Sequence, residues 1–401
     1  MNVRPDLFLA RRQRGLTLIE LMVALVIGMV LTVAVFGVLA AWEGKKRVTT
    51  GLNDLEQAGN LALYELDQWV RSAGSGFSST AGAGNSAYGC LLRASAESGQ
   101  TLPRTSALAA PFASVDLDGD GNFPLLPAMI VPDATTPGES GQPSDALLVM
   151  GGSAHHGGAA LSLSADPTDT TLRLDNTVGV SADELLLLFD PSVGNRCLLT
   201  QVASSAATSL TLDVDGSFYA ATVDDTSIAS SFKKEGLVLP IGSPTTDPPQ
   251  FQLIGVGDHN TLYSYDLLQS GGADVALQAR AEGVFEMHAL YGVDNDGNGT
   301  IDEWVSAGSG SDYAASKLMA GTPTARTLIL RIKAVRVGLI LRTTLPEKTA
   351  EETSTPSMLY LFRDLGDGLR YERALSGDAL KYRYRVMEAT LVLRNNMAIK
   401  G

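Results

Sequence analysis

An uninterrupted apolar stretch near the amino terminus constrains this chain more than any other feature. From Leu21 to Trp42 only Thr32 carries a polar side chain. As a helix these residues would extend roughly 33 Å, enough to cross the hydrocarbon core of a bilayer. A single carboxylate, that of Glu20, lies at the start of the stretch, and four arginines precede it. An ionisable group is costly in lipid, so the sequence predicts a membrane helix whose acidic residue has a function.

Two simpler explanations of this stretch each leave part of the sequence unexplained. A secretory signal would have a shorter apolar core followed by a small-residue cleavage site, whereas this stretch runs into Lys45, Lys46 and Arg47. A plain signal anchor, whose amino terminus the arginines hold in the cytoplasm, is an alternative. Neither explains the sequence Gly-Leu-Thr-Leu-Ile-Glu that stands directly before the apolar run, at residues 15–20.

Residues 15–20 and the apolar run after them resemble the class III signal of type IV pilins and pseudopilins. The resemblance implies that residues 1–15 are a leader, which a prepilin peptidase removes between Gly15 and Leu16 on the cytoplasmic face. It also implies methylation of the new amino group of Leu16, and a helix that stays in the mature protein as the inner spine of a filament. Leu16 stands where the family most often has phenylalanine.

The charge at Glu20 suits such an assembly. After cleavage, Leu16 would carry a positive amine about one helical turn away from Glu20. In an array of packed helices, Glu20 of one subunit could meet the amine of a neighbour. This pairing would offset part of the desolvation of both charges, and loss of one partner would leave a buried charge. We therefore expect Glu20 to act in assembly rather than in membrane insertion.

Length and charge bound the remainder of the chain. A chain of 401 residues can form one membrane helix and one large or two smaller globular units. The formal net charge is −14, and removing the leader, whose charge is +3, leaves −17. This acidity argues against a general nucleic-acid or anionic-membrane surface.

The two cysteines, Cys90 and Cys197, both follow the membrane stretch. The charge bias places them outside the cytoplasm, where an oxidising environment favours a disulfide. Closing a loop of roughly 100 residues would contribute on the order of 4 kcal/mol by the chain-entropy argument. The alternative is two buried free thiols.

A helical pattern continues beyond the membrane stretch. Proline is absent from residues 16–71, so one long helix is expected, with residues 16–42 in the membrane and residues 43–73 amphipathic. We expect its apolar stripe to pack on a globular head, and a coiled-coil partner is the weaker alternative because the pattern is short. Apolar or small residues recur at spacings of three and four: Val48, Leu52, Leu55, Gly59, Ala62, Leu66 and Trp69.

Residues 74–401 are rich in Gly, Ser, Thr and Ala and contain short apolar segments, a pattern typical of short strands. We predict an α+β fold in which the long helix packs on a mostly antiparallel β-rich head. The turn-rich residues 243–249 are a candidate subdomain boundary. Residues 328–341 are long enough for a helix, although alternation favours a strand from Val335 onward. The candidate strands are residues 146–150, 171–174, 184–189, 197–202, 209–214, 236–241, 251–256, 261–265, 284–291, 327–342, 357–362 and 382–394.

Two acidic loops could bind calcium. Alternate oxygen-bearing side chains, with Gly299 at a sharp turn, resemble an EF-hand-type loop. The resemblance fails where that loop has its bidentate glutamate, because Val305 stands there and Glu303 comes early, and the alternative is a turn without an ion. The expected ligands are Asp294, Asp296, Asn298, Thr300 and Asp302. A weaker loop runs into prolines and is equally well read as a solvated turn; its candidate ligands are Asp116, Asp118, Asp120 and Asn122.

No residue pattern indicates catalysis. His155 and His156 are adjacent and lack a third metal ligand, which is typical of an exposed loop. His259 and His288 are isolated, and nucleophile-elbow, zinc-protease and phosphate-loop motifs are absent from the sequence. We expect a protein that is not an enzyme.

Two later motifs are similar to those of the PilW group of type IV pilus minor pilins. They are residues 291–294, Tyr-Gly-Val-Asp, and residues 384–386 with 393–395. The resemblance implies a low-abundance subunit that is held in the bacterial inner membrane with its head in the periplasm. Such a subunit joins other minor pilins and the major pilin at the inner-membrane assembly platform and primes assembly, at the pilus tip. Twitching motility, adhesion or DNA uptake would follow indirectly, and no direct contact with nucleic acid is expected. Residues 78–280 match no pattern.

Two alternatives remain from the sequence alone. A minor pseudopilin of type II secretion shares the leader and the helix. A membrane-anchored, calcium-dependent envelope adhesin or enzyme would need a catalytic constellation that the sequence does not show.

Overall fold

The computed structural model describes most of the chain and divides it into two compact units, Met1–Asp54 and Leu55–Gly401. Helix α1 (Leu18–Ser72) contributes to both units. The described residues are 15–80, 86–96, 99–136, 138–153, 159–190, 192, 195–216, 218–219, 222–224, 226–269, 276–346, 355–397 and 399.

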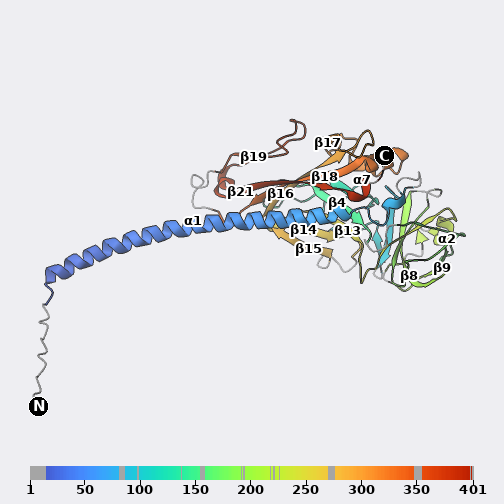
Figure 1. Cartoon of the computed structure of the whole chain (residues 1–401), viewed down its shortest axis with the longest axis horizontal. Coiled ribbons are helices and arrows are strands. Elements are labelled where there is room, and N and C mark those ends of the chain that lie inside the picture. The colour runs from blue at the N-terminus through green and yellow to red at the C-terminus, as the bar shows by residue number, and fades with distance from the viewer. Residues whose placement is uncertain are drawn as a thin grey trace, which may run out of the picture. The chain divides into compact units, whose positions relative to one another are not determined.

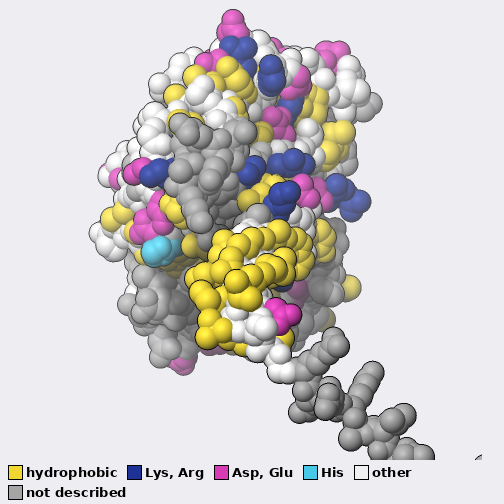
Figure 2. Space-filling view, turned by 90° about the vertical axis from the view of Figure 1, so that its left-hand side faces the viewer, with side chains coloured by type: hydrophobic (Ala, Val, Ile, Leu, Met, Phe, Trp, Pro, Cys, Tyr) yellow, Lys and Arg dark blue, Asp and Glu magenta, His cyan; other side chains and the backbone are white. Residues whose placement is uncertain are grey.

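In the first unit, α1 is an exposed apolar helix. Residues Leu18–Ala40 have a mean hydropathy of 2.8 and are long and apolar enough to cross a membrane. Figure 2 shows their side chains as a yellow surface beside the grey amino-terminal residues. The long helix predicted from residue 16 to about residue 73 is confirmed, since α1 ends at Ser72.

In the second unit, one stripe of α1 is buried in the main core. Its spacing is the one that a single helix face requires. A Cβ at Gly59 would come within 2.5 Å of the side-chain ends of Met387 and Leu341, which would then have to shift. The predicted packing of the stripe on the head is confirmed from Leu55 onward, and Trp69 is half buried. The buried positions are Leu55, Gly59, Ala62, Leu66 and Val70.

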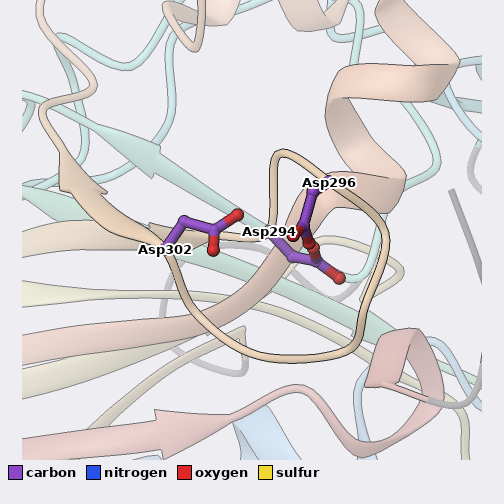
Figure 3. A group of neighbouring side chains, drawn as sticks. All are labelled: Asp294, Asp296 and Asp302. Carbon is purple, nitrogen blue, oxygen red and sulfur yellow. The ribbon is translucent and has the colours of Figure 1, made fainter.

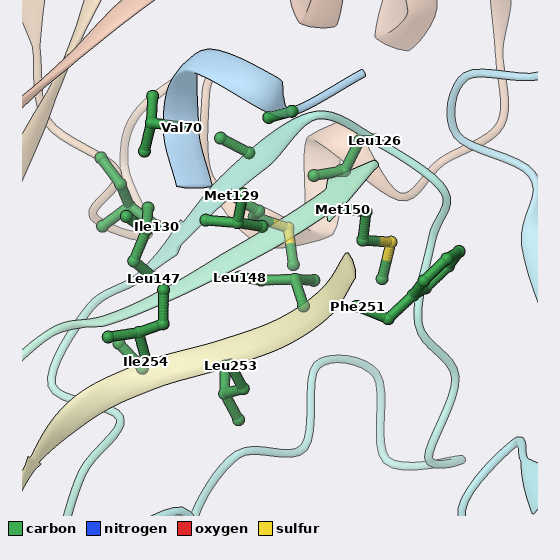
Figure 4. Packing of buried hydrophobic residues seen from close by; sticks show 14 of the residues in the cluster. Val70, Leu126, Met129, Ile130, Leu147, Leu148, Met150, Phe251, Leu253 and Ile254 are labelled. Carbon is green, nitrogen blue, oxygen red and sulfur yellow. The ribbon is translucent and has the colours of Figure 1, made fainter. Parts of the chain in front are cut away.

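A five-stranded antiparallel sheet shares this core with α1. Figure 4 shows Val70 beside Met129 and Ile130, with Leu147 and Leu148 on the next strand. All of these side chains are almost fully buried. In order across the sheet, the strands are β15 (Leu277–Glu282), β14 (Thr261–Asp266), β13 (Gln250–Gly257), β4 (Ala146–Gly151) and β3 (Ala128–Val131).

A four-stranded antiparallel sheet carries the carboxyl-terminal part of the head (Figure 1). Its central pair is long, with Tyr291 opposite Val335, and its register shifts once near each end. In order, the strands are β17 (Glu303–Val305), β16 (Val284–Val293), β18 (Ile332–Arg342) and β21 (Tyr384–Val392).

The ambiguous stretch before β18 divides into a helix and a strand. Helix α5 (Pro323–Arg331) begins with proline at its first position, where the missing N–H costs nothing, and the Thr322 side chain accepts a hydrogen bond from Ala325 N at 3.2 Å. The strand expected from Val335 onward is confirmed. The strand expected from Thr327 is wrong for residues 327–331, which are helical.

A third sheet contains eight strands, and its β1–β8 pair is parallel, unlike the other pairs of described strands. The main path is β2-β1-β8-β7-β12-β5, while β9 pairs with both β8 and β6. The strands are β1 (Leu91–Ala96), β2 (Gly99–Leu102), β5 (Leu161–Ser162), β6 (Thr171–Arg173), β7 (Leu185–Phe189), β8 (Arg196–Ala206), β9 (Ser209–Leu212) and β12 (Leu237–Gly242).

This third sheet separates two hydrophobic cores. Strand β7 directs Leu185, Leu187 and Phe189 into the main core, whereas Leu186 and Leu188 enter a second core. Because both faces are buried, the strand reads as a continuous apolar run rather than an alternating one. We call the second core and the described residues that line it, all between residues 161 and 238, the lobe. Its short elements are β10 (Thr222–Val223), β11 (Thr226–Ser227) and α2 (Ile228–Ser231).

A hairpin of β19 (Met358–Leu361) and β20 (Tyr371–Ala374) forms a third, smaller core with Phe285 and Ile340. The other short helices are η1 (Ser78–Thr80), η3 (Asp258–Asn260), α4 (Ala315–Leu318), η4 (Gly377–Lys381) and α7 (Arg394–Met397).

The turn-rich residues 243–249 connect β12 of the eight-stranded sheet to β13 of the five-stranded sheet. Ile241 and Phe251, on either side of this connection, both belong to the main core. The connection therefore joins two sheets that share one core.

Replacing Leu66 by alanine tests the packing of α1. Leu66 is fully buried, so Leu66→Ala should lower the free energy of unfolding by about 2–5 kcal/mol. Tyr64→Ala is the matched control on the same helix, because Tyr64 is 64% exposed, and it should change the free energy by less than about 0.5 kcal/mol. Urea unfolding of both variants gives the comparison; equal losses would contradict the assigned face.

Candidate functional site

The first turn of α1 is closed by a capping box. Thr17 precedes the helix, and its backbone N and Oγ1 donate to Glu20 Oε2 at 3.1 and 3.0 Å. Glu20 N donates in return to Thr17 Oγ1 at 3.3 Å. Each side chain thus satisfies a backbone donor of the first helical turn. Among the described residues, the other carboxylate oxygen of Glu20, Oε1, accepts no hydrogen bond.

The cap places a second function on Glu20, one that sequence reasoning missed. The signal was present, since threonine followed three residues later by glutamate is the capping pattern. Gly15 and Leu16 lie outside the helix, and Leu16 is 76% exposed. The peptide bond expected to be cut is thus accessible. The rest of the expected leader, residues 1–14, lies outside the described residues.

The first acidic loop connects β16 to β17 and gathers three carboxylates (Figure 3). One oxygen of each of Asp294, Asp296 and Asp302 lies within 4.8 Å of the others. Asp294 is 1% exposed, whereas Asp296 and Asp302 are exposed. Gly297 and Gly299 have φ of 75° and 88°, which other residues rarely adopt, so the glycines allow the loop to turn back on Asp294.

Hydrogen bonds hold these carboxylates in place. Asp294 Oδ1 accepts from Gly297 N at 2.7 Å, and its Oδ2 accepts from Gly299 N at 2.8 Å. Asp302 Oδ2 accepts from Asn295 N at 2.7 Å. Burial would raise the pKa of Asp294, but the two glycine N–H groups and the nearby Lys333 ammonium hold it below its usual value. Asp294 is therefore ionised at neutral pH.

The donor set of the loop fits a hard divalent cation. Each carboxylate oxygen that accepts one N–H still has a lone pair for a second partner, and calcium prefers oxygen ligands. Asn298 Oδ1, another expected ligand, accepts from Thr300 N at 2.7 Å. Val305 instead pairs with Tyr291 in the sheet and offers no side-chain ligand. Glu303 Oε1 accepts from Asn295 Nδ2.

Lys333 links this loop to the end of the chain. Its ammonium, 1% exposed, lies 4.0 Å from Asp294 Oδ2 and donates to the carbonyls of Asn396 and Ile399 at 2.9 and 2.8 Å. Burial lowers the pKa of Lys333, and the Asp294 carboxylate opposes this effect. The ammonium is thus compensated by one carboxylate and two carbonyl oxygens.

Two neighbouring asparagines continue the link to α1. Asn396 Oδ1 accepts from Tyr88 Oη at 2.8 Å, and its Nδ2 donates to the carbonyls of Ile329 and Ile332. Asn395 Nδ2 donates to the carbonyl of Ala73 at 2.7 Å, at the carboxyl end of α1. Carbonyls at a helix end have no partner within the helix, so Asn395 acts as a cap.

The weaker acidic loop has a different geometry. Its three aspartates, all described, form no comparable group of carboxylates. Asp118 accepts from the backbone N of Asp120 and from Asn122 Nδ2, and Arg93 donates to Asn122 Oδ1. Asp116 accepts from Gly119 N. These bonds are those of a closed turn.

Cys90 and Cys197, which are 107 positions apart in sequence, form a disulfide with Cα atoms 5.7 Å apart. The predicted bond is confirmed. The parallel pairing of β1 with β8 brings the two cysteines together. Leu92 of β1 stands opposite Cys197 of β8, and Cys90 lies two residues before Leu92.

His288 lies in a buried cluster of charges. Its Nδ1 is 3.6 Å from Asp145, its Nε2 is 3.9 Å from Glu286, and its ring stacks on Tyr371. Burial alone would lower the pKa of His288, but the two carboxylates raise it to about 9. Arg373 pairs with Glu286 at 3.1 Å. His259 is exposed beside Glu139, and residues 155 and 156 lie outside the described part of the chain.

Two family models match the chain. Residues 255–395 match the model described as Type IV Pilus-assembly protein W, and residues 10–36 match the prokaryotic N-terminal methylation motif. Both matches are consistent with a PilW-type pilin. Searches of curated proteins and of solved structures gave no match.

The PilW match contains the Asp294 loop, Lys333 and Asn395, whereas the lobe lies outside both matches. The apolar helix and the methylation motif fit a membrane-anchored pilin that is later incorporated into a pilus. The two resemblances noted in the sequence are thus confirmed.

The cluster around His288 should make the stability of this protein depend on pH. Because the pKa of His288 is raised in the folded protein, protonated His288 contributes to the stability in full below about pH 6.5, the pKa of an unfolded histidine. That contribution is lost as the pH rises through about 9. Thermal unfolding between pH 6 and pH 10 should show this loss, and His288→Gln should reduce it. His259→Gln, at an exposed histidine, should leave the profile unchanged. Identical profiles for wild type and His288→Gln would contradict the assignment.

Proposed function

We propose that this chain is a minor pilin that primes type IV pilus assembly. Prepilin peptidase cuts it between Gly15 and Leu16, and the new amino group is methylated. The observation that carries the proposal is an exposed apolar helix that starts at a methylation motif and continues into a PilW-type head. The proposed role is mechanical and involves no substrate turnover.

The geometry at Glu20 supports a role in assembly. Its Oε2 is held by the Thr17 cap, which orients the carboxylate while Oε1 can accept from the amine of a neighbouring Leu16. In an apolar array such a pair offsets part of the desolvation of both charges, and removing one partner is strongly unfavourable. The pair would also fix how far one helix is displaced along another.

The proposed partners are the other minor pilins, the major pilin, prepilin peptidase and the inner-membrane assembly platform. In this proposal the head lies in the periplasm before assembly and at the pilus tip afterwards, and twitching motility, adhesion and DNA uptake depend on it indirectly. The match to the PilW model favours the pilus over a type II secretion pseudopilin.

Replacing Glu20 separates assembly from processing. In a deletion strain, Glu20→Gln should be cut and found in the membrane like wild type, yet its amount in sheared pili should fall by more than tenfold, since breaking such a pair costs about 3–5 kcal/mol. Glu43→Gln, on the same helix beyond the apolar residues, is the control and should assemble normally.

Mass spectrometry of the mature chain measures processing, and mass spectrometry of sheared pili measures assembly. Equal recovery of Glu20→Gln in pili would disprove the assembly role. A mature chain that begins elsewhere than at Leu16 would disprove the proposed processing. Normal pili in the deletion strain, with loss of a binding or hydrolytic activity, would favour an envelope adhesin or enzyme.

We also propose that the Asp294 loop binds calcium. Asp294, Asp296 and Asp302 would supply carboxylates, with Asn298 Oδ1 and the Thr300 carbonyl as further ligands. The support is the convergence of three carboxylates on one point and the depressed pKa of Asp294. The ion would neutralise the carboxylates and bridge the two ends of the loop.

Calcium should then stabilise the head. At 100 times the dissociation constant it should add about 2.7 kcal/mol to the free energy of unfolding, seen as a higher melting temperature than with chelator. Asp296→Asn should abolish this increase, because its exposed side chain contributes charge to the loop without contacting Lys333. Asp118→Asn, in the weaker loop, should preserve it. An unchanged melting temperature of wild type with calcium would refute the site.

A further inference from the structure

Two consecutive lysines, Lys45 and Lys46, follow the apolar part of α1. We call them the basic collar. The helix continues through them, and Lys45 and Lys46 are exposed. The candidate membrane span ends at Ala40, and Trp42 lies between this end and the collar, 62% exposed, with Lys46 Nζ 5.9 Å from its ring centroid. A tryptophan and a lysine in this position mark the level where a helix leaves a bilayer.

The collar differs in charge from the rest of the chain. Residues 1–47 carry a net charge of +4, so the 354 residues from Val48 onward carry −18. Within the described residues, neither Lys45 nor Lys46 forms a salt bridge, and both ammonium groups are free for an external anion. An anionic surface would repel the acidic residues beyond Val48 and attract the collar.

We propose that the basic collar binds the headgroups of anionic phospholipids at the bilayer surface where α1 emerges. The chemistry is that of long cationic side chains, whose stems lie along the helix while their ammonium groups reach phosphate. Each basic residue close to such a surface changes the preference for anionic lipid about fivefold. The inference rests on the membrane anchoring of α1 and is independent of the proposed role in pilus assembly.

Trp42 provides a probe at the level of the collar. The full-length protein is placed, one copy per particle, in lipid nanodiscs of equal parts phosphatidylglycerol and phosphatidylcholine. One lipid at a time carries bromine near its headgroup, and bromine quenches tryptophan fluorescence at close range. Trp42→Phe measures the signal of the other two tryptophans, which is subtracted. Because the probe lies at the collar end of the span, the leader arginines at the opposite end do not contribute.

In the wild-type protein, brominated phosphatidylglycerol should quench Trp42 more than brominated phosphatidylcholine, with a relative lipid affinity of about 25-fold, the product of two fivefold effects. Lys45→Gln combined with Lys46→Gln should reduce the ratio to near one. Lys234→Gln combined with Lys317→Gln removes the same charge from exposed head positions and should leave the ratio unchanged. Salt at about 1 M should weaken the preference.

Two results would overturn the proposal. One is equal quenching by both lipids in the wild type, and the other is a preference that survives loss of Lys45 and Lys46. If the wild type shows no lipid preference while the collar variant fails to enter pili, the collar pairs with acidic groups of a neighbouring subunit instead. Unchanged melting temperatures confirm that each variant is folded.

Discussion

The burial of one face of α1 in the main core is the interaction on which the rest of the head depends. Apolar packing through Leu66 and Val70 fixes which side of the helix faces the sheets, but packing alone does not fix the helix end. Hydrogen bonds do so, since Asn395 reaches the carbonyl of Ala73 and Asn396 is bound to Tyr88. The main core positions the helix, and the polar contacts end it at a defined place.

The same polar contacts extend to the Asp294 loop. Lys333 binds the carbonyl of Asn396 on one side and faces Asp294 on the other, so the loop and the carboxyl-terminal segment share one buried cation. A buried charge that loses its partner is strongly unfavourable. The loop carboxylate is therefore needed for the arrangement of the carboxyl-terminal segment, whether or not an ion is bound.

Much of the fold follows from local pattern, and the remainder from contacts that pattern cannot show. The apolar stripe and absence of proline predicted α1, and alternation predicted β18 from Val335. The start of α5 was overlooked although Thr322 and Pro323 signal it, because the apolar run after them was assigned to a strand. Strands such as β20, with the polar sequence Tyr-Glu-Arg-Ala, carry no periodic signal. Two partners of His288, Asp145 and Tyr371, come from segments more than 80 positions away, which spacing cannot reveal.

Strand β7 has a consequence for how this protein can change over generations. Its alternate side chains belong to different cores, so substitutions at Leu186 or Leu188 act on the lobe, whereas Leu187 acts on the core that holds α1. The lobe also lies outside both family matches. Selection can thus remodel the lobe through one set of residues while the framework that holds the helix is inherited unchanged.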